Sequence, residues 1–214
     1  MQCHICDEET EHFTDEKSGV VYYHCQPCAY MFKSPKYYQP LERQKSRYDL
    51  HENDAEDAGY KAYFQRFLDF VLPHTGTVRT ALDFGCGKST LLSDILNSMD
   101  IQCDYYDPIY HPELPYDSKK YDMIVSTEVF EHLHQPKAVF EKLVSLLSPD
   151  GILALQTQFH PNDPEAFKKW YYHKDPTHIV FFTAETFHRL AQVYGCELIA
   201  DNGKNMVVIR KRGV

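Results

Sequence analysis

The sequence of 214 residues lacks any apolar run near the roughly 18 residues that a membrane-spanning helix needs, so we expect no membrane contact. It also lacks a basic excess: 22 Lys and Arg stand against 31 Asp and Glu, which gives a formal net charge of −9. Binding to nucleic acid depends on a basic surface, so this balance weighs against a nucleic-acid partner while leaving room for a local basic patch. No internal repeat or low-complexity tract stands out.

The N-terminus has no basic region followed by an apolar stretch, so we expect no secretion signal. Seven cysteines are an odd number, and four of them form two close pairs. Without a secretion signal, this usage favours metal ligation in a reducing compartment over disulfides, and it predicts a cytoplasmic location. The length suits one sizeable core with a small appendage.

The two cysteine pairs are C-x2-C knuckles, Cys3–Cys6 and Cys25–Cys28, with residues 7–24 between them. Zinc takes four tetrahedral ligands, and each knuckle places two thiolates on one side of the ion. The pattern predicts a zinc ribbon over residues 1–35, a segment too short to bury a core without a metal. Because four protein ligands leave no open position, we expect a structural site.

Other interpretations of these cysteines are open. The four residues could be unrelated, or they could hold iron, which also accepts four thiolates. His4 and His24 lie next to the knuckles and could replace a cysteine ligand. The three other cysteines are expected to be small buried residues: Cys86, Cys103 and Cys196.

The rest of the chain divides into a connector over 36–79 and a second domain over 80–214. The connector is polar and without a clear period over 36–55, and a helix pattern follows over 58–72. Beyond it we predict strands at 80–84, 102–107, 121–126 and 152–157, helices at 89–99, 136–147 and 182–194, and a closing antiparallel pair at 196–200 and 206–210. Residues 159–178 have little regular period. Alternating strands and helices predict an α/β fold with a doubly wound, mostly parallel sheet.

A glycine-rich turn follows the first of these strands, in Asp83-Phe-Gly85-Cys-Gly87. Between a strand and a helix, such a turn presents backbone N–H groups to a ligand at the carboxyl edge of the sheet. Asp107 ends the next strand, where a carboxylate can accept both hydroxyls of a ribose. The segment Gly87-Lys-Ser-Thr also resembles the end of a P-loop, but that motif needs glycine where Leu82 stands, so we reject it.

With these features, residues 80–211 resemble the class I S-adenosylmethionine-dependent methyltransferases. The matching segments are Ala81–Gly87, Asp107, Tyr121–His132 and Leu146–Leu153. Asp175–His178, with Phe181-Phe-Thr, resembles a later segment of a bacterial branch that also carries an N-terminal zinc ribbon. The resemblance implies a Rossmann-like fold and methyl transfer from S-adenosylmethionine; it is specific for the superfamily and poor at naming a substrate.

Two departures from the family pattern stand out. Ser89 replaces the usual third glycine, which narrows the approach to the methionine tail of the cofactor. The stretch from Asp107 to Asp122 leaves little room for the usual helix and third strand, so we expect that edge of the sheet to be trimmed. The family's adenine-binding acid has no secure match, with Glu113-Leu114 as the candidate.

The resemblance implies where the cofactor would lie. Asp83 would lie near its methionine end, Asp107 would hold the ribose, and Glu128 beside Thr127 would face the transferred methyl group. The full predicted set of cofactor-binding residues is Asp83, Gly85, Cys86, Gly87, Asp107, Pro108, Leu114, Thr127 and Glu128.

A general base is needed only if the methyl acceptor carries a proton, as a hydroxyl does. We predict Glu128, His132 and His178 as the catalytic residues, with Glu131 and His173 as further candidates, although any one histidine among the twelve could be structural. Glu128, Glu131 and His132 could also bind a divalent metal, as similar clusters do in some related methyltransferases. We favour the alternative in which the glutamates only cap a helix start.

The leading hypothesis is a methyltransferase acting on a small molecule or a protein. A second is an RNA methyltransferase whose ribbon grips RNA, which the acidic composition weighs against. A third is a non-catalytic cofactor-binding module that docks proteins, motivated by Ser89 and the short sheet edge. The aromatic run Trp170–Tyr172 could roof the acceptor pocket or only pack against the sheet. The sequence gives neither the acceptor nor the oligomeric state.

Overall fold

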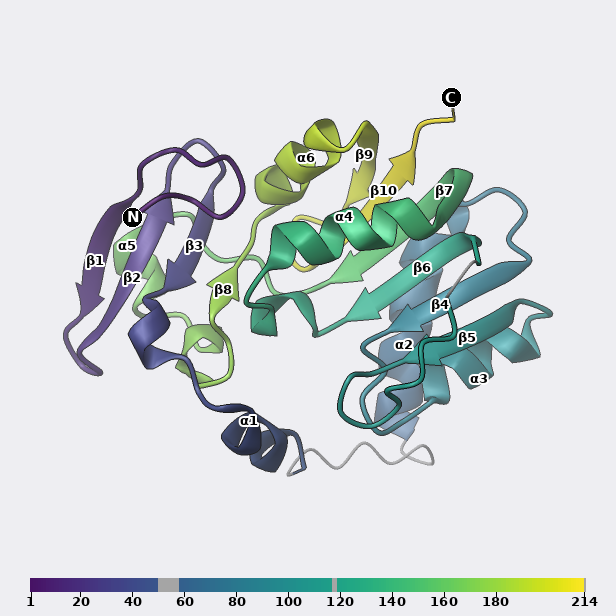
Figure 1. The fold of residues 1–214 in the computed structure, drawn as a ribbon, viewed down its shortest axis with the longest axis horizontal. Coiled ribbons are helices and arrows are strands. Elements are labelled where there is room, and N and C mark those ends of the chain that lie inside the picture. Colours follow the sequence, from purple (N-terminus) through teal and green to yellow (C-terminus); the bar gives the residue numbers. More distant parts are fainter. Residues whose placement is uncertain (50–57, 117–118, 214) are drawn as a thin grey trace.

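The computed structural model describes residues 1–49, 58–116 and 119–213. Its larger sheet consists of β4 (Thr80–Phe84), β5 (Gln102–Tyr106), β6 (Tyr121–Thr127), β7 (Leu147–Gln156), β9 (Cys196–Asp201) and β10 (Met206–Lys211). The strand order is β5-β4-β6-β7-β10-β9 (Figure 1). β4 pairs in parallel with β5 and β6, and β6 with β7, whereas β10 is antiparallel to both of its neighbours. The predicted mostly parallel sheet and its closing antiparallel pair are confirmed.

Helices cover both faces of this sheet (Figure 1). They are α2 (Ala58–Val71), α3 (Leu91–Ser98), α4 (Pro136–Leu146) and α6 (Ala184–Val193). Phe67 of α2 and Leu92 of α3 share a buried cluster with Val125 of β6. The next residue toward the N-terminus, Ile124, faces the other cluster, which contains residues of α4 and α6. Since neighbouring strand residues point to opposite faces, the sheet is doubly wound as predicted.

The sheet is short at the edge formed by β5. Between Asp107 and Lys120, the described residues form no further strand, and only an isolated bridge joins Asp107 to His111. The trimmed edge expected from the short connection is therefore confirmed for the described part of this segment. No helix within the described residues is both long and apolar enough to cross a membrane.

A second, antiparallel sheet lies at one end of the molecule (Figure 1). Its strands, in order across the sheet, are β1 (Glu11–Asp15), β2 (Val20–Cys25), β3 (Tyr30–Lys33) and β8 (Val180–Phe181). The fourth strand comes from far along the chain and pairs Met31 with Phe181. Two residues are too few for a strand pattern, so the sequence did not reveal this pairing. The N-terminal segment is thus joined to the larger domain by backbone hydrogen bonds as well as by apolar packing.

Two segments expected to be irregular contain short helices. The connector holds a 3₁₀ turn, η1 (Pro35–Tyr37), and α1 (Leu41–Tyr48), so the expectation for 36–55 is wrong over 36–48; residues 50–55 lie outside the described residues. The α1 sequence, Leu-Glu-Arg-Gln-Lys-Ser-Arg-Tyr, has strong helix formers but no apolar stripe, which hides it from a periodicity search. Residues 159–178 hold α5 (Pro164–Phe167) and η4 (Tyr172–Lys174).

Residues 149–151, which lie between the helix predicted over 136–147 and the strand predicted over 152–157, form a bulge within a longer strand. β7 begins at Leu147, opposite Tyr121, and its register with β6 then shifts so that Ile152 faces Met123. A Cβ on Gly151 would lie 2.9 Å from the Ser148 carbonyl oxygen and 3.1 Å from that of Tyr121. Only glycine tolerates this backbone approach, which explains why glycine stands at the bulge.

Candidate functional site

The glycine turn, residues 85–87, is fixed against the end of β5. Gly85 N and Cys86 N donate to the Tyr106 carbonyl at 2.7 and 3.2 Å. Gly85 (φ +83°) and Gly87 (φ +66°) both adopt left-handed backbone conformations that favour glycine. A Cβ on Gly85 would also overlap the side chain of Val129. The turn therefore lies directly beside the segment that follows β6.

Asp107 lies across this turn. Its Oδ2 accepts from Gly87 N at 3.1 Å, and its Oδ1 accepts from the backbone N–H groups of Ile109 and Tyr110 at 2.8 and 3.0 Å. The carboxylate is thus held by backbone donors at the carboxyl edge of the sheet. Asp49, just after α1, accepts from the Tyr110 hydroxyl at 2.8 Å and pairs with Lys88 at 2.7 Å.

The other predicted cofactor-binding residues divide into two groups. Asp83 is buried at the end of β4, and burial raises the pKa of its carboxyl to about 7. Thr127 ends β6 and is half-buried. Pro108 and Leu114 are exposed beyond β5, with Leu114 51% exposed.

Two carboxylates meet just beyond β6. Glu128 follows the strand directly with a left-handed φ of 54°, and Glu131 is fully buried in η3 (Phe130–His132). The Tyr172 hydroxyl lies 2.7 Å from Glu128 Oε2 and 2.5 Å from Glu131 Oε1. Tyr63 of α2 donates to Glu128 Oε1 at 3.3 Å. Because a hydroxyl has one hydrogen, the two carboxylates share a single donor at Tyr172.

Burial sets the electrostatics of this pair. Burial and the neighbouring Glu131 raise the pKa of Glu128 to about 8, and burial raises the pKa of Glu131 as well. A left-handed conformation at a residue other than glycine costs on the order of 1–3 kcal/mol and persists only where the surroundings enforce it. Strain and raised carboxyl pKa values together are typical of functional sites.

Two imidazoles lie beside the carboxylates. His132 Nδ1 is 3.0 Å from the Thr177 carbonyl, and His178 Nδ1 is 2.8 Å from the Tyr172 carbonyl. A carbonyl only accepts, so each neutral ring carries its proton on Nδ1 and keeps a free lone pair on Nε2. Burial lowers the pKa of His132, and it lowers the pKa of His178 to about 3, so both rings are neutral at pH 7.

These groups form what we call the acid–histidine cluster: Glu128, Glu131, His132, Tyr172 and His178. Ligand atoms of Glu131, His132 and His178 all lie within 4.8 Å of one another, and His132 Nε2 is 3.8 Å from Glu131 Oε1. Glu131 Oε2 is buried and has no hydrogen-bond partner among the residues that the structure describes. Imidazoles held at Nδ1 by a carbonyl are oriented as metal-binding histidines are. The three residues therefore suit a divalent cation, with His178 in the position that the sequence assigned to Glu128.

Two further candidates lie outside this cluster. His173 Nε2 is 3.7 Å from Asp15 Oδ2, and its ring packs on Phe167 next to the small sheet. Within the aromatic run, Trp170 packs against Phe181, whereas Tyr171 is 64% exposed. The run thus combines packing at its ends with an exposed ring in the middle.

The thiol cluster, Cys3, Cys6, Cys25 and Cys28, lies in the small sheet and its loops. The four Sγ atoms are within 4.8 Å of one another, and three of the residues are buried. His24 is engaged at both ring nitrogens, by Asn162 at 2.8 Å and Gln26 at 3.3 Å, and His4 stacks on Phe32. The cluster therefore fits a tetrahedral metal with four thiolate ligands without help from either histidine.

Both the glycine turn and the acid–histidine cluster lie within residues 55–201, which match the family model of a methyltransferase domain. The chain belongs to this methyltransferase-domain family. The predicted enzyme class, an S-adenosylmethionine-dependent methyltransferase, is thereby confirmed. A search of the curated proteins finds no match to the methyltransferase.

Solved structures share the fold of this methyltransferase at low sequence identity. The N-methyltransferase NodS from Bradyrhizobium japonicum, in complex with S-adenosylhomocysteine, is 12% identical with a TM-score of 0.53, covering 79% of this chain and 97% of that one. The plantazolicin methyltransferase BpumL, in complex with a desmethylPZN analogue and S-adenosylhomocysteine, is 15% identical with a TM-score of 0.50, covering 81% and 91%. These likenesses confirm the Rossmann-like fold.

The sequence analysis did not identify the two tyrosines of the methyltransferase that bond the carboxylates. Tyr63 lies within the helix pattern predicted over 58–72, and Tyr172 belongs to the aromatic run for which a role over the acceptor pocket and a packing role were both left open. Helical spacing shows which side of α2 faces the sheet, but it does not distinguish a packed ring from one whose hydroxyl reaches a buried acid. A buried carboxyl pair needs donors, and that requirement is the signal that could have pointed to nearby tyrosines.

Proposed function

We propose that this methyltransferase binds S-adenosylmethionine across the glycine turn and transfers the methyl group to a small molecule or a protein. The observation that carries the proposal is the contact between Gly85 and Val129, which lies between Glu128 and Glu131. A ligand held at the glycine turn would therefore have its reactive end next to the acid–histidine cluster. Binding and chemistry would occupy neighbouring positions at the carboxyl edge of one sheet.

In this proposal Asp107 accepts from the ribose hydroxyls, and Gly85, Cys86 and Gly87 line the methionine end. The three backbone bonds to Asp107 support this role because they fix both carboxylate oxygens. The buried Asp83 would face the cofactor's ammonium group, whose positive charge favours the ionised carboxylate. Pro108 and Leu114 would lie at the adenine, and Thr127 with Glu128 at the transferred methyl group.

The proposed reaction is an in-line displacement. A lone pair of the acceptor forms a bond to the methyl carbon while the bond from that carbon to the sulfonium sulfur breaks, and S-adenosylhomocysteine leaves. The protein mainly positions the acceptor and excludes water, because the leaving group is already activated. If the acceptor is a hydroxyl, its proton passes to Glu128, with His132 and His178 as the other candidate bases.

The acid–histidine cluster also fits a divalent cation. Glu131, His132 and His178 would hold it, and the buried, unpartnered Glu131 Oε2 supports this assignment. Such an ion would lower the pKa of an acceptor hydroxyl that it bound. The ion would also compensate the charge of the two carboxylates that share the Tyr172 hydroxyl.

The thiol cluster is proposed to hold one structural zinc ion. The buried sulfurs and the engaged His24 support a closed shell of four thiolates. Because thiolates and free cysteines persist under reducing conditions, we propose a cytoplasmic location. Residues 1–35 as a ribbon, 36–79 as a connector and 80–214 as the cofactor domain remain proposed boundaries.

A methyl-transfer assay with fractionated extract tests the proposed function. Zinc-replete protein and methyl-labelled S-adenosylmethionine are added to the small-molecule fraction and to the protein fraction. We expect labelled product in one of the two fractions. A Glu128→Gln variant should bind S-adenosylhomocysteine normally and transfer label about 100-fold more slowly, or slower still, because the proposed base is gone.

The control is Glu185→Gln, an exposed residue on α6 that pairs with Arg189. It should match the wild type in both binding and transfer. Cofactor binding without label in either fraction would favour the non-catalytic module instead. Well-folded protein that binds no cofactor would contradict the proposal altogether.

A further inference from the structure

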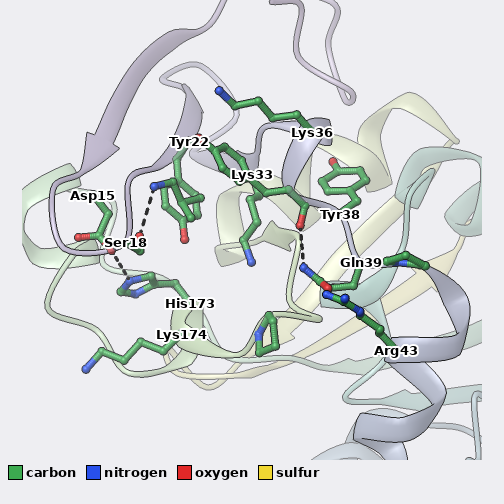
Figure 2. Close-up of a pocket in the computed structure, with 14 residues that line it drawn as sticks. Asp15, Ser18, Tyr22, Lys33, Lys36, Tyr38, Gln39, Arg43, His173 and Lys174 are labelled. Carbon is green, nitrogen blue, oxygen red and sulfur yellow. Dashed lines mark hydrogen bonds and ion pairs between the residues drawn. The ribbon is translucent and has the colours of Figure 1, made fainter.

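A cavity of about 620 Å³ lies between the small sheet and the segment that leads into α1 (Figure 2). Its walls come from three separate stretches of chain: the β1–β2 hairpin with β3, residues 36–43, and the residues around η4. The cavity is therefore formed only when the small sheet, the connector and the late segment come together. None of the roles proposed above uses it.

The charged side chains that line the cavity are mostly cations. Lys33, Lys36, Arg43 and Lys174 all contribute to its walls, against a single carboxylate, Asp15. The chain as a whole has a net charge of −9, so this grouping runs against the overall balance. Clustered cations in a concave surface focus a positive field and raise the local concentration of anions.

The single carboxylate is already engaged at one wall. Asp15 accepts from the Ser18 hydroxyl at 2.6 Å and from Lys17 N at 3.2 Å, and it lies 3.7 Å from His173 Nε2. These bonds hold the carboxylate within its own hairpin turn, beside His173, as Figure 2 shows. Within the described residues, Asp15 forms no ion pair with any of the four cations.

Lys33 is the least exposed of these cations. It reaches from β3 into the middle of the cavity, and it is 4% exposed (Figure 2). Its ammonium donates to the Asp175 carbonyl at a long 3.5 Å, and no carboxylate within the described residues lies within ion-pair distance of it. A buried ammonium has three donors and normally needs a compensating charge. A bound anion would supply that charge.

A second, smaller cavity continues toward the acid–histidine cluster. It measures about 310 Å³, shares Lys174 and Pro176 with the first cavity, and is lined by Tyr172 and His178. The two shared residues make the cavities neighbours, so one molecule that reached across Lys174 and Pro176 would have an anionic group beside Lys33 and another part toward the cluster.

We propose that the cationic cavity binds the phosphoryl group of the methyl acceptor, which would make the acceptor a phosphorylated small molecule. A phosphoryl group carries up to two negative charges and three acceptor oxygens. It can therefore bind several cations from separate elements at once, which a ligand carboxylate with one charge does less well. The anion site stands on its own residues, whereas its role as an acceptor subsite rests on the proposed methyl transfer.

Calorimetric titration with pyrophosphate tests this site. Zinc-replete wild-type protein, Lys33→Met, Arg43→Ser and the control Lys61→Met are each titrated, and S-adenosylhomocysteine binding is measured on the same samples. Lys61 is exposed on α2, away from the cavity. We expect Lys33→Met to weaken pyrophosphate binding about tenfold or more, and Arg43→Ser to weaken it by a smaller factor. The control and the cofactor affinity should not change.

The outcomes separate this proposal from the proposed function. Protein that binds the cofactor but not pyrophosphate at millimolar concentration overturns the anion site, as does equal binding by wild type and Lys33→Met. Should Lys33→Met not fold, Arg43→Ser, on the surface, decides in its place. Tighter binding of a short single-stranded RNA than of pyrophosphate would overturn the small-molecule acceptor in favour of nucleic acid. Pyrophosphate binding without any cofactor binding would overturn only the acceptor role.

Discussion

The thiol cluster and the acid–histidine cluster each bring candidate metal ligands together, but these ligands have opposite chemistry. The four Sγ atoms of the thiol cluster lie within 4.8 Å of one another, and so do the ligand atoms of Glu131, His132 and His178 in the other cluster. Four soft sulfurs would close the shell of a tetrahedral ion, whereas one carboxylate and two imidazoles would leave positions open. A closed shell stabilises a fold, and an open one can bind a substrate.

The two clusters also lie in different parts of the fold. The thiol cluster lies in a small sheet that packs on the larger domain through Tyr30, whose ring contacts that of Phe182. The acid–histidine cluster lies at the carboxyl edge of the parallel sheet, next to a glycine turn, and contains the strained Glu128. Ligand number and softness, together with position in the fold, are thus the grounds on which we propose a structural role for the thiol cluster and a chemical role for the acid–histidine cluster.

The largest expected effect comes from opening the thiol cluster. Cys25→Ser should remove one zinc ligand, unfold the small sheet and lower the Tm by about 10 °C or more, because zinc binding energy is folding energy in such sites. Scanning calorimetry measures the change in Tm, and metal analysis of the purified variant measures the loss of zinc. Cys196→Ala, a buried cysteine outside the cluster, should cost about 1 kcal/mol and keep the zinc. Equal losses in the two variants would contradict a structural zinc site.

Opening the other cluster should change activity instead of the fold. Glu131→Gln should slow turnover about 100-fold or more while leaving S-adenosylhomocysteine affinity within about threefold. It should also abolish Mn²⁺ binding, read by electron paramagnetic resonance, because Mn²⁺ prefers carboxylate and imidazole over thiolate. Glu185→Gln is the matched control. Unchanged Mn²⁺ binding in Glu131→Gln would rule out this ligand set.

Asp83 gives an intermediate effect that depends on pH. Its pKa is raised to about 7 in the folded protein, above the unfolded value of 3.8, so the folded state holds the proton more tightly. The stability that the protonated Asp83 contributes to the fold is complete below the unfolded pKa and is lost as pH rises through 7. The free energy of unfolding of Asp83→Asn, taken relative to that of the wild type, should therefore rise by about 1–3 kcal/mol from pH 5 to pH 7.5. Urea unfolding at several pH values measures this change. A constant difference across this range would contradict the raised pKa.

The smallest effect is expected at the surface contact between the thiol cluster's loop and α4. Lys137 Nζ lies 3.4 Å from Asp7 Oδ2, and Asp7 is 75% exposed. Exposed ion pairs contribute little, so Lys137→Ala should change the free energy of unfolding by less than about 1 kcal/mol in urea titrations. A larger loss of unfolding free energy would mean that this ion pair, and not the apolar contact at Phe182, holds the small sheet against the larger domain.

The sequence predicted those parts of the molecule that have a regular hydrophobic period or a fixed spacing between motif residues. The parallel strands, α2 and α6 follow from such signals, and α6 begins after Thr183, whose hydroxyl accepts from Thr186 N as a helix cap does. The two knuckles bring four thiolates together because each turn is local. Asp107 could be expected beside the glycine turn because neighbouring parallel strands end at the same edge.

What the sequence missed depends on contacts between distant segments. The pairing of Phe181 with Met31 spans two residues, too short for any pattern. The hydroxyl of Tyr172 meets the two carboxylates only because η4 folds back over the end of β6. The burial of Lys33 similarly requires the connector and η4 to close around it. Such contacts arise from tertiary packing, which local patterns in a single sequence do not predict.

The most direct test is calorimetric titration of zinc-replete protein with S-adenosylhomocysteine, alongside Asp107→Ala. Our account predicts micromolar binding by the wild type and loss of binding in the variant, because the carboxylate across the glycine turn would hold the ribose. Thermal unfolding of both proteins shows that the variant is folded. Well-folded wild type that does not bind, or an Asp107→Ala variant that binds equally well, would contradict the proposed cofactor site.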